Sequence, residues 1–323
     1  MAAAGQRVFI VYSYHPDYFW QQDEEQGIKK ALSGMDVTFD SYCLDSKKHQ
    51  GQEWLAQQVK ICLEKIEGFQ PDVIITCDDN AAKTIGRIFF KQKIPVVFLG
   101  LNGEPEAYGL VESGRRQHPG ANITGVLERH YYHDATVLLQ TILLANNLKV
   151  KKLDIITDDS STSTILLKSL RQEAWKTPWE LAFLPQAKTF TQYKEQILGV
   201  NQPGHAAFIY NLETLKNNDN HVPDMDVLAW TSKYLAIPAV AFHEYYLKKG
   251  AALCGVVVSG RTQGYHAGLK VKQILGGVSA GEIPIDRPPK GTVVLNISVA
   301  ERLGVKIPLE ILLSADIVYD AEK

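Results

Sequence analysis

Aromatic and polar side chains follow the first short apolar run of the sequence. The run Val8–Tyr12 leads into Ser13–Trp20 (SYHPDYFW), which holds four aromatic residues among eight. Aromatic rings in a loop are costly to expose unless they stack on something. Either at least two of these rings face a ligand, or Tyr18 and Phe19 pack beneath the loop, and the sequence leaves both readings open.

Carboxylate and amide side chains follow two later apolar runs. Asp78, Asp79 and Asn80 come after Val73–Thr76, and Asn102 comes shortly after the next run. Asp79 or Asn80 is expected to cap the helix that follows. A second carboxylate is then left over to bind a ligand amine or hydroxyl. The candidate binding residues of this half are Ser13, Tyr14, Tyr18, Trp20, Asp78, Asp79, Asn80 and Asn102.

The second half of the chain repeats this arrangement. A run of small hydrogen-bonding residues, Asp158–Thr164, leads into a predicted helix. Free backbone N–H groups at a helix start suit a carboxylate or phosphate, although a solvated cap explains the same residues. Further polar groups follow two later apolar runs. The candidates here are Ser160, Ser161, Thr162, Asn211, Glu213, His243 and Glu244.

These residues must be positioned by alternating strands and helices. In the first half we predict strands at 8–12, 37–42, 73–76 and 96–99, with helices at 21–32, 51–67 and 80–91. In the second half we predict strands at 153–157, 179–183, 206–210 and 239–242, with helices at 134–144, 163–173, 191–198 and 224–234. Continuously apolar strands indicate a sheet covered on both faces, and strand–helix alternation indicates parallel pairing. In such sheets ligands bind beyond the carboxyl ends of the strands, where the candidates lie.

The two halves show similar strands in the same order and at similar spacing, which predicts two equivalent α/β lobes. Pro95 and Pro238 begin the last strand of each set in similar contexts, IPVVF and IPAVAF. After a further strand at 255–259, Gly260, Gly264 and Gly268 recur every four residues, which predicts close helix packing. A strand at 292–296 and a short helix at 299–303 follow. We expect lobe 1 to comprise residues 7–125 plus 256–290, and lobe 2 to comprise 126–255 plus 291–323.

Composition and motifs exclude several classes of protein. The chain has 323 residues, 45% of them hydrophobic, and a net charge of −2, which disfavours disorder and a nucleic-acid partner. Catalytic and nucleotide-binding signatures such as Gly-x-Ser-x-Gly and the P-loop are absent. His130 and His133 lack an evident third ligand, so we expect no metal, no cofactor and no enzyme activity. The four cysteines form no CxxC pair and are expected to be free thiols, three of them buried.

The segments IPVVFLGLN, GANITGVLER, DIITDDSST and VVLNISVAERLGVKIP together resemble the solute-binding proteins of ABC transporters, of the tryptophan/tyrosine-binding type. The resemblance implies the type I periplasmic-binding-protein fold, with two Rossmann-like lobes and ligand contacts at the strand-end loops named above. It also implies a periplasmic or extracellular location. The chain shows no signal sequence or lipobox cysteine, and its first loop is unusually aromatic for this family.

We therefore expect a binding protein that captures an amino acid or aromatic zwitterion by hinge closure and delivers it to an ABC importer. The hinges are predicted near 125–126, 253–255 and 290–292. Asp78 or Asp79 would hold the amine, the helix start at 160–162 the carboxylate, and the first-loop rings the apolar part. We expect a monomer with an importer permease or a receptor module as its partner. The input domain of a membrane signalling receptor and a Rossmann-like enzyme are the alternatives.

Overall fold

The computed structural model describes residues 5–46, 48–49, 51–172, 177–218 and 220–320, without the side chains of Ser161 and Gln172. These residues form two compact units. Lobe 1 contains the chain up to Arg129 together with Ser259–Pro289, and lobe 2 contains His130–Val258 together with the chain from Lys290 onward. The backbone passes between the units after Arg129, after Val258 and after Pro289, so each lobe is assembled from separate stretches of sequence.

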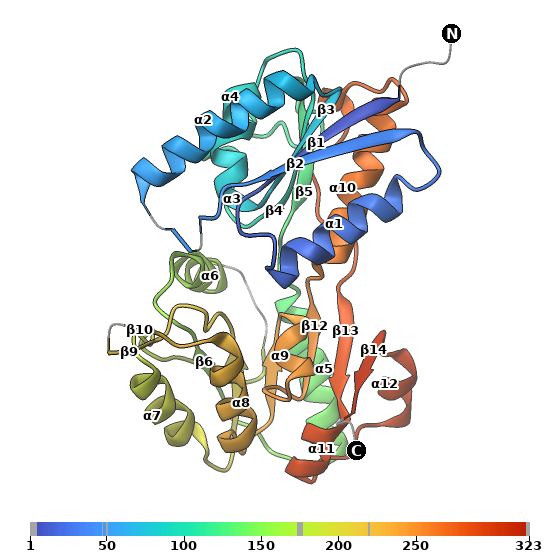
Figure 1. The fold of residues 1–323 in the computed structure, drawn as a ribbon. Helices are drawn as coiled ribbons and strands as arrows, with labels where there is room; N and C mark the ends of the chain where they lie inside the picture. Colours follow the sequence, from blue (N-terminus) through green and yellow to red (C-terminus); the bar gives the residue numbers. More distant parts are fainter. Residues whose placement is uncertain (1–4, 47, 50, 173–176, 219, 321–323) are drawn as a thin grey trace. The chain divides into compact units, whose positions relative to one another are not determined.

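Lobe 1 is built on a five-stranded, fully parallel sheet with the strand order β2-β1-β3-β4-β5 (Figure 1). The strands are β1 (Gln6–Tyr12), β2 (Val37–Cys43), β3 (Val73–Cys77), β4 (Val96–Leu101) and β5 (Ile123–Leu127). The helices are α1 (Phe19–Ala31), α2 (Gln52–Phe69), α3 (Asp78–Ala81), α4 (Arg87–Phe89) and α10 (Gly260–Leu275), with a π-helical turn at Ala82–Gly86 and a 3₁₀ turn at Ala280–Glu282.

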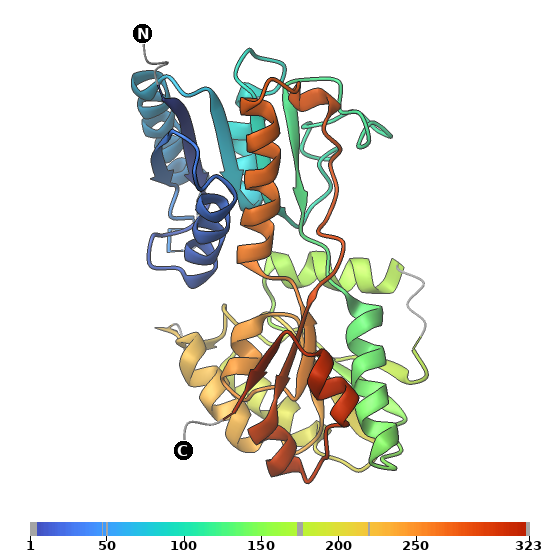
Figure 2. The same cartoon turned by 90° about the vertical axis from the view of Figure 1, so that its right-hand side faces the viewer.

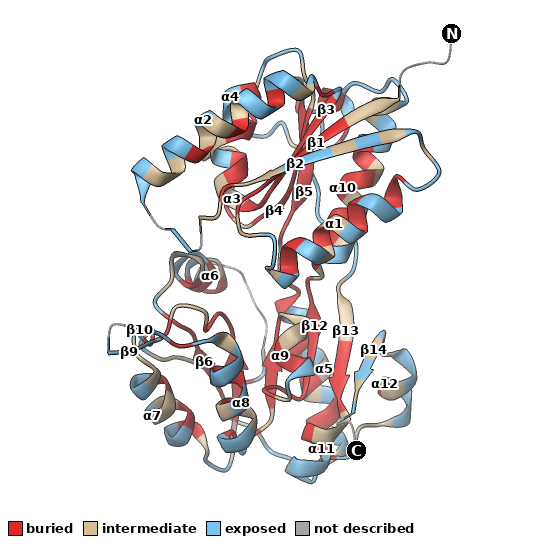
Figure 3. Ribbon diagram, viewed as in Figure 1, coloured by how far each residue is buried: buried red, intermediate tan, exposed pale blue. Residues whose placement is uncertain are grey.

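Alternating side chains of the strands fill two separate cores, one on each face of this sheet. Phe9 and Val11 of β1 pack toward α2, whereas Val8 and Ile10 pack toward α1 and α10. Figure 3 shows the resulting buried strands between helices whose outer faces are exposed. The period of two along β1 is the one expected for a strand covered on both sides.

The glycine stripe of α10 lets that helix touch α1 directly, which confirms the predicted close packing. A Cβ atom added to Gly264 would lie 2.0 Å from the backbone oxygen of Glu24, and one added to Gly268 would lie 2.6 Å from Ala31 Cβ. From the other side, a Cβ on Gly27 of α1 would lie 2.1 Å from the backbone oxygen of Arg261. Real Cβ atoms do not approach so closely, so these positions accept only glycine at this helix separation.

Lobe 2 contains a seven-stranded sheet with the order β14-β13-β12-β11-β8-β6-β7, and a small hairpin of β9 and β10. The strands are β6 (Lys152–Ile156), β7 (Glu180–Phe183), β8 (His205–Ile209), β9 (Lys216–Asn217), β10 (Asn220–His221), β11 (Ala239–Ala241), β12 (Cys254–Val257), β13 (Thr292–Asn296) and β14 (Ile317–Tyr319). The helices are α5 (Tyr132–Ala145), α6 (Ser161–Gln172), α7 (Phe190–Val200), α8 (Asp224–Tyr234), α9 (Glu244–Lys248), α11 (Ile297–Leu303) and α12 (Leu309–Ser314).

Helices cover both faces of the lobe 2 sheet. Tyr193 of α7 and Val227 of α8 belong to one core with Ile156 and Ile209. Helix α5 contacts β11 and β12 and lies on the opposite side of the sheet in Figure 2. A capping box begins α7, where the Thr189 side chain accepts a hydrogen bond from the Gln192 backbone N–H. Such reciprocal caps fix where a helix starts.

The two lobes share one strand order, which confirms the predicted duplication. In lobe 2 the order β7-β6-β8-β11-β12 repeats the order β2-β1-β3-β4-β5 of lobe 1. Each lobe therefore has one topological switch point, between β1 and β3 in lobe 1 and between β6 and β8 in lobe 2. Lobe 2 adds β13, which runs antiparallel to β12, and β14, which runs parallel to β13.

The structure differs from the sequence-based expectation at several elements. Strand β5 was not predicted, because Gly125 interrupts its short apolar pattern. The glycine is needed there, since a Cβ would lie 2.3 Å from the Phe98 ring on β4. The helix expected at 80–91 begins at Asp78 and contains the π-helical turn. The expected end of another helix, Glu173, lies outside the described residues. Within the described ranges, every helix is too short or too polar to cross a lipid bilayer.

Candidate functional site

The switch point of lobe 1 is organised by Ser13, which follows β1. Its backbone N–H donates to the Cys77 backbone oxygen at 3.2 Å, and its hydroxyl donates to the same oxygen at 2.6 Å. The hydroxyl also accepts from the Ala81 backbone N–H at 2.9 Å, so Ser13 caps the helix after β3. The expectation that Asp79 or Asn80 makes this cap is wrong. Asn80 instead donates to the Ser46 hydroxyl at 2.9 Å.

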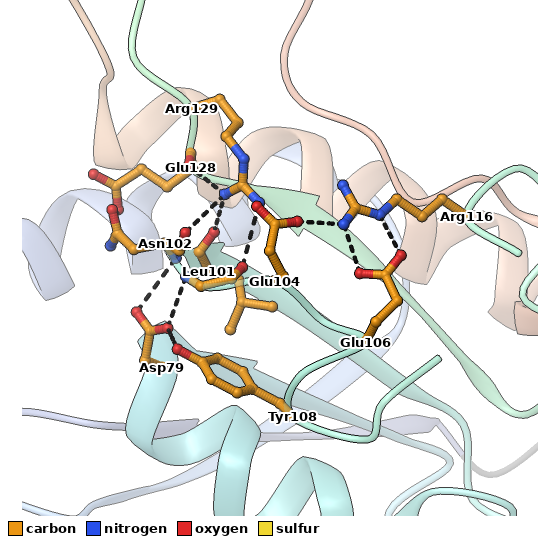
Figure 4. A network of polar contacts seen from close by, with 10 residues as sticks. Asp79, Leu101, Asn102, Glu104, Glu106, Tyr108, Arg116, Glu128 and Arg129 are labelled. Atoms are coloured by element: carbon orange, nitrogen blue, oxygen red, sulfur yellow. Dashed lines mark hydrogen bonds and ion pairs between the residues drawn. The ribbon is translucent and has the colours of Figure 1, made fainter. Parts of the chain in front are cut away.

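Asp79 fastens the loop that follows β4 (Figure 4). Its carboxylate accepts from the backbone N–H groups of Asn102 and Gly103, at 3.3 and 3.0 Å, and from the Tyr108 hydroxyl at 2.6 Å. Asp79 therefore has a structural task in shaping this loop.

Arginine residues hold the rest of this loop in place. The Arg129 guanidinium donates to four backbone carbonyls and pairs with Glu104 at 2.9 Å (Figure 4). Arg116 pairs with Glu104 and Glu106, and its hydrogen bonds hold the pKa of Glu106 below its usual value. The four carbonyls belong to Leu101, Asn102, Gly103 and Glu128. These cations are thus engaged in shaping the loop.

Three buried carboxyl groups gather at this edge of the sheet. Glu24 is 0% exposed, Asp78 is 3% exposed and Glu128 is 4% exposed. They come from α1, from the end of β3 and from the residue after β5. Glu128 Oε2 accepts from the Asn102 side-chain nitrogen at 3.0 Å. We call these three residues the acid cluster.

Gly100 allows two members of the acid cluster to approach each other. A Cβ at this position would lie 2.9 Å from Glu24 Oε1 and 2.9 Å from Asp78 Oδ1, so these two oxygens are at most twice that distance, 5.8 Å, apart. The positive φ of 65° at Gly100 also favours glycine. Gln263 of α10 fixes the strand here, since its side chain accepts from the Gly100 N–H and donates to the Leu127 carbonyl.

Burial and mutual repulsion oppose ionisation of this cluster. The pKa of Glu24 is raised well above its usual value, first by desolvation and then by the charges of Asp78 and Glu128. The pKa of Tyr14 is raised for the same reasons, with burial the largest cause and Asp78 the next. A cation bound at this point would favour the ionised form of the carboxylates, because it brings the opposite charge.

The aromatic residues of the first loop have different environments. Tyr18 lies edge-on to Tyr14 at 5.2 Å between ring centroids and contacts Phe19 at 5.0 Å. Trp20 is 7% exposed, and its ring lies 3.3 Å from where a Cβ on Gly260 would be. Trp20 therefore packs against α10 and Tyr18 packs within the loop. Tyr14 is the half-buried ring nearest in sequence to Ser13.

Asp158 organises the switch point of lobe 2. Its Oδ1 accepts from the Ser160 N–H and hydroxyl at 3.1 and 2.6 Å and from the Ser163 hydroxyl at 2.6 Å. Its Oδ2 accepts from the N–H and hydroxyl of Thr214 at 3.0 and 2.8 Å. Burial and the charge of Glu213 raise the pKa of Asp158, against these hydrogen bonds. Of the residues predicted to bind a ligand carboxylate, Ser160 thus already serves a carboxylate of this chain. Thr162 is half-buried, and the Ser161 side chain lies outside the described part.

Histidine and aromatic rings surround the next strand ends of lobe 2. Tyr210 after β8 and His243 after β11 stack at 5.0 Å between ring centroids. The Tyr210 hydroxyl bonds to His130 Nε2 at 2.7 Å, and Phe242 meets the His130 ring edge-on at 5.8 Å. Sequence reasoning weighed His130 only as a metal ligand, whereas the structure makes it part of a ring cluster.

The remaining predicted residues of lobe 2 also have partners. The Asn211 backbone oxygen accepts from the Asp158 N–H at 2.9 Å, and its φ of 43° lies in the left-handed region that asparagine tolerates. Glu213 accepts a hydrogen bond from the Tyr245 hydroxyl, and Glu244 accepts one from the Tyr319 hydroxyl.

Sequence reasoning missed Glu24 and Glu128. A glutamate in an amphipathic helix is normally solvent-exposed. Only its spacing from Gly27 and Ile28, which places Glu24 on the same face of the helix, could have indicated that it is buried. Glu128 would have been a strand-end candidate had β5 been recognised. Of the predicted residues in lobe 1, Ser13, Asp78, Asp79 and Asn102 lie together around the ends of β1, β3 and β4, whereas the Trp20 ring packs against α10.

The doubled strand order and the strand-end polar groups define a type I periplasmic-binding-protein fold with two Rossmann-like lobes. The sequence profile of the ABC transporter substrate-binding proteins matches residues 20–319, and the chain belongs to this family. Proteins of this family are extracytoplasmic and bind solutes. No curated protein matches the sequence.

Solved structures support the same fold. The chain is similar to a Streptococcus pneumonia ABC domain in complex with L-Trp, with 16% identity, a TM-score of 0.71 and coverage of 98% of this chain and 100% of the other. It is similar to a ligand-free, open substrate-binding protein with adhesive properties from Clostridium difficile, at 16% identity, TM-score 0.71 and coverage of 98% and 99%. An arabinose-binding protein from Geobacillus stearothermophilus matches at 13% identity, TM-score 0.55 and coverage of 92% and 99%.

Proposed function

We propose that this chain is an extracytoplasmic solute-binding protein that captures a small ammonium-bearing molecule, such as an amino acid, and delivers it to an ABC importer. The acid cluster at the lobe 1 switch point, in a chain of this family, is the observation that supports the proposal. A related domain carries L-Trp, so tryptophan and compounds like it are the first ligands to test.

The acid cluster supplies what an ammonium group requires. Asp78 and Glu128 are almost fully buried beside Glu24, where charge-assisted hydrogen bonds are stronger than in water. Tyr14 is the aromatic ring that we assign to the apolar part of the ligand. We do not assign the ligand carboxylate to Ser160, because its hydroxyl donates to Asp158 at 2.6 Å.

We propose that capture involves closure of the two lobes about the chain crossings, which lie after Arg129, Val258 and Pro289. Three crossings form a natural hinge, because hinge closure concentrates backbone rotation in a few connecting residues. Closure around a ligand removes water from the carboxylates and strengthens their contacts with a cation.

A thermal-shift screen tests this proposal. The panel contains the twenty L-amino acids, their decarboxylated amines and their N-acetyl derivatives. A ligand present at 100 times its Kd stabilises a protein by about 2.7 kcal/mol, which raises Tm by roughly 5–10 °C for a lobe of this size. We expect amino acids or amines to raise Tm and the matching N-acetyl compounds to have no effect.

The variant pair Asp78→Asn and Asp40→Asn localises the effect. Asp40 is an exposed carboxylate on β2 of the same lobe, so its loss should leave the ligand-induced shift unchanged. Asp78→Asn should remove most of it. Stabilisation only by compounds without an amine, or an undiminished shift in Asp78→Asn, would refute the proposed ligand class.

A further inference from the structure

Glu24 is an acid without the partners that buried acids normally have. It is 0% exposed, and within the described part of the chain no donor makes a hydrogen bond of normal geometry to either carboxylate oxygen. The nearby Trp20 indole favours the ionised form only weakly compared with the effects of burial, Asp78 and Glu128. The Tyr12 hydroxyl is also buried among the described residues without a partner. Buried polar groups in proteins are normally satisfied.

The groups that face Glu24 carry little positive charge. On α10, Gln263 is neutral and Arg261 pairs with Asp23 at 2.9 Å, where its side chain is 58% exposed. The Lys270 amine, further along α10, donates to the Pro284 carbonyl and pairs with Asp286. Among the described residues, the titratable groups around Glu24 are Asp23 and Glu25 on α1, Tyr12 on β1, Cys77 and Asp78 at the end of β3, and Glu128 after β5.

An ionised Glu24 would be an uncompensated charge in this environment, which is unfavourable. Burial and the neighbouring acids therefore favour the protonated form of Glu24. A metal ion is a poor substitute for that proton, because the described residues include no group of three or more acid, histidine or cysteine side chains that could hold one. An organic cation needs only one or two of the carboxylates within hydrogen-bond distance.

We infer that lobe 1 exchanges a proton held by Glu24, Asp78 and Glu128 for the ammonium group of its ligand, so that Glu24 sets both the charge that the ligand must carry and the pH dependence of capture. The inference rests on the proposed function and adds a specificity residue and a linked proton to it. Only the O–H bond of one carboxylic acid breaks, its proton passes to solvent, and the ammonium group replaces that positive charge in the cluster.

Linkage gives the exchange a measurable size. If one proton leaves for each ligand bound, Kd falls about tenfold for each pH unit gained below the pKa of the free cluster. At a site where the ligand competes with no proton, Kd would instead stay constant as long as the ammonium group stays charged. Capture should therefore weaken as the medium becomes acidic.

Isothermal titration calorimetry with the amines of the panel tests the inference. Titrations at one pH in phosphate and in Tris separate buffer protonation from binding. We expect close to one proton released per ligand at a pH below the pKa of the free cluster, with Kd rising as pH falls from 8 to 5. Glu24→Gln should abolish most of the release and flatten the pH dependence. Glu25→Gln, one residue along α1 and paired with Lys29, should behave as the original chain.

The outcomes separate the two proposals. Binding of an amine with no proton release and a constant Kd between pH 5 and 8 overturns the inference and leaves the proposed function intact, even if Glu24→Gln fails to fold. The same holds if Glu24→Gln folds and retains full proton release. If no amine binds at any pH in this range, the proposed ligand class and the inference both fail.

Discussion

Gly264→Ala should destabilise lobe 1, because α10 packs on α1 with no room for a side chain. The added Cβ would lie 2.0 Å from the backbone oxygen of Glu24 and 2.8 Å from its carbonyl carbon. Ordinary contact begins near 3.4 Å, so the helices must separate locally by more than about 1 Å, which is large for a close-packed interior. Both clashing atoms belong to the backbone, so a rotamer change cannot relieve the contact.

The net effect follows from two opposing terms. Overpacking a well-packed core costs about 1–3 kcal/mol, and a backbone clash belongs at the upper end of that range. Alanine regains up to about 1 kcal/mol over glycine inside a helix. We therefore expect Gly264→Ala to lose about 2 kcal/mol, which lowers the urea midpoint by about 1 M for an m value near 2 kcal/mol/M.

Urea denaturation followed by far-ultraviolet circular dichroism measures this change. Gly68→Ala on α2 is the matched control, since a Cβ at Gly68 meets nothing within 4 Å. That variant should gain about 0.5–1 kcal/mol from helix propensity alone. If Gly264→Ala is as stable as the original chain, or gains as much as Gly68→Ala, the close packing of α1 on α10 is refuted.

Three further predictions concern other contacts. Glu24→Gln should stabilise the protein increasingly as pH rises above about 4.5, because the raised pKa of Glu24 makes the folded chain hold a proton that the unfolded chain has lost. If the urea midpoint changes by the same amount between pH 5 and pH 8 in the variant and in the original chain, this prediction is wrong. Asp79→Ala should cost about 1–3 kcal/mol and accelerate amide hydrogen exchange at residues 102–108, since three donors lose their acceptor; unchanged exchange there would contradict the role of Asp79. Thr189→Ala should cost about 1 kcal/mol by removing the α7 cap, and an unchanged urea midpoint would count against the cap.

The architecture of both lobes could be predicted from local patterns. Uninterrupted apolar strands such as Val73–Cys77 alternate with amphipathic helices, and this alternation is enough to indicate parallel sheets covered on both faces. The spacing of Gly260, Gly264 and Gly268 anticipated the helix contact. These features could be predicted because they depend on residues close together in sequence.

The acid cluster could not be predicted in the same way. Glu24 is buried because α1 lies against α10, more than two hundred residues later in the chain, and because Gly100 has no side chain. Recognising Glu128 as a strand-end residue required predicting β5, whose apolar pattern is interrupted by a glycine that makes room for Phe98. The Asp158 contacts with Ser160 and Thr214 likewise join two strand-end loops. Each of these groups acquires its role from tertiary contacts.

A crystal structure of the protein with the most strongly stabilising amine or amino acid tests the central claim most directly. The account predicts that the ligand nitrogen lies within about 3.2 Å of a carboxylate oxygen of Asp78, Glu128 or Glu24, the hydrogen-bond range for such a pair. A ligand bound elsewhere, or one whose nitrogen points away from all three carboxylates, would contradict it.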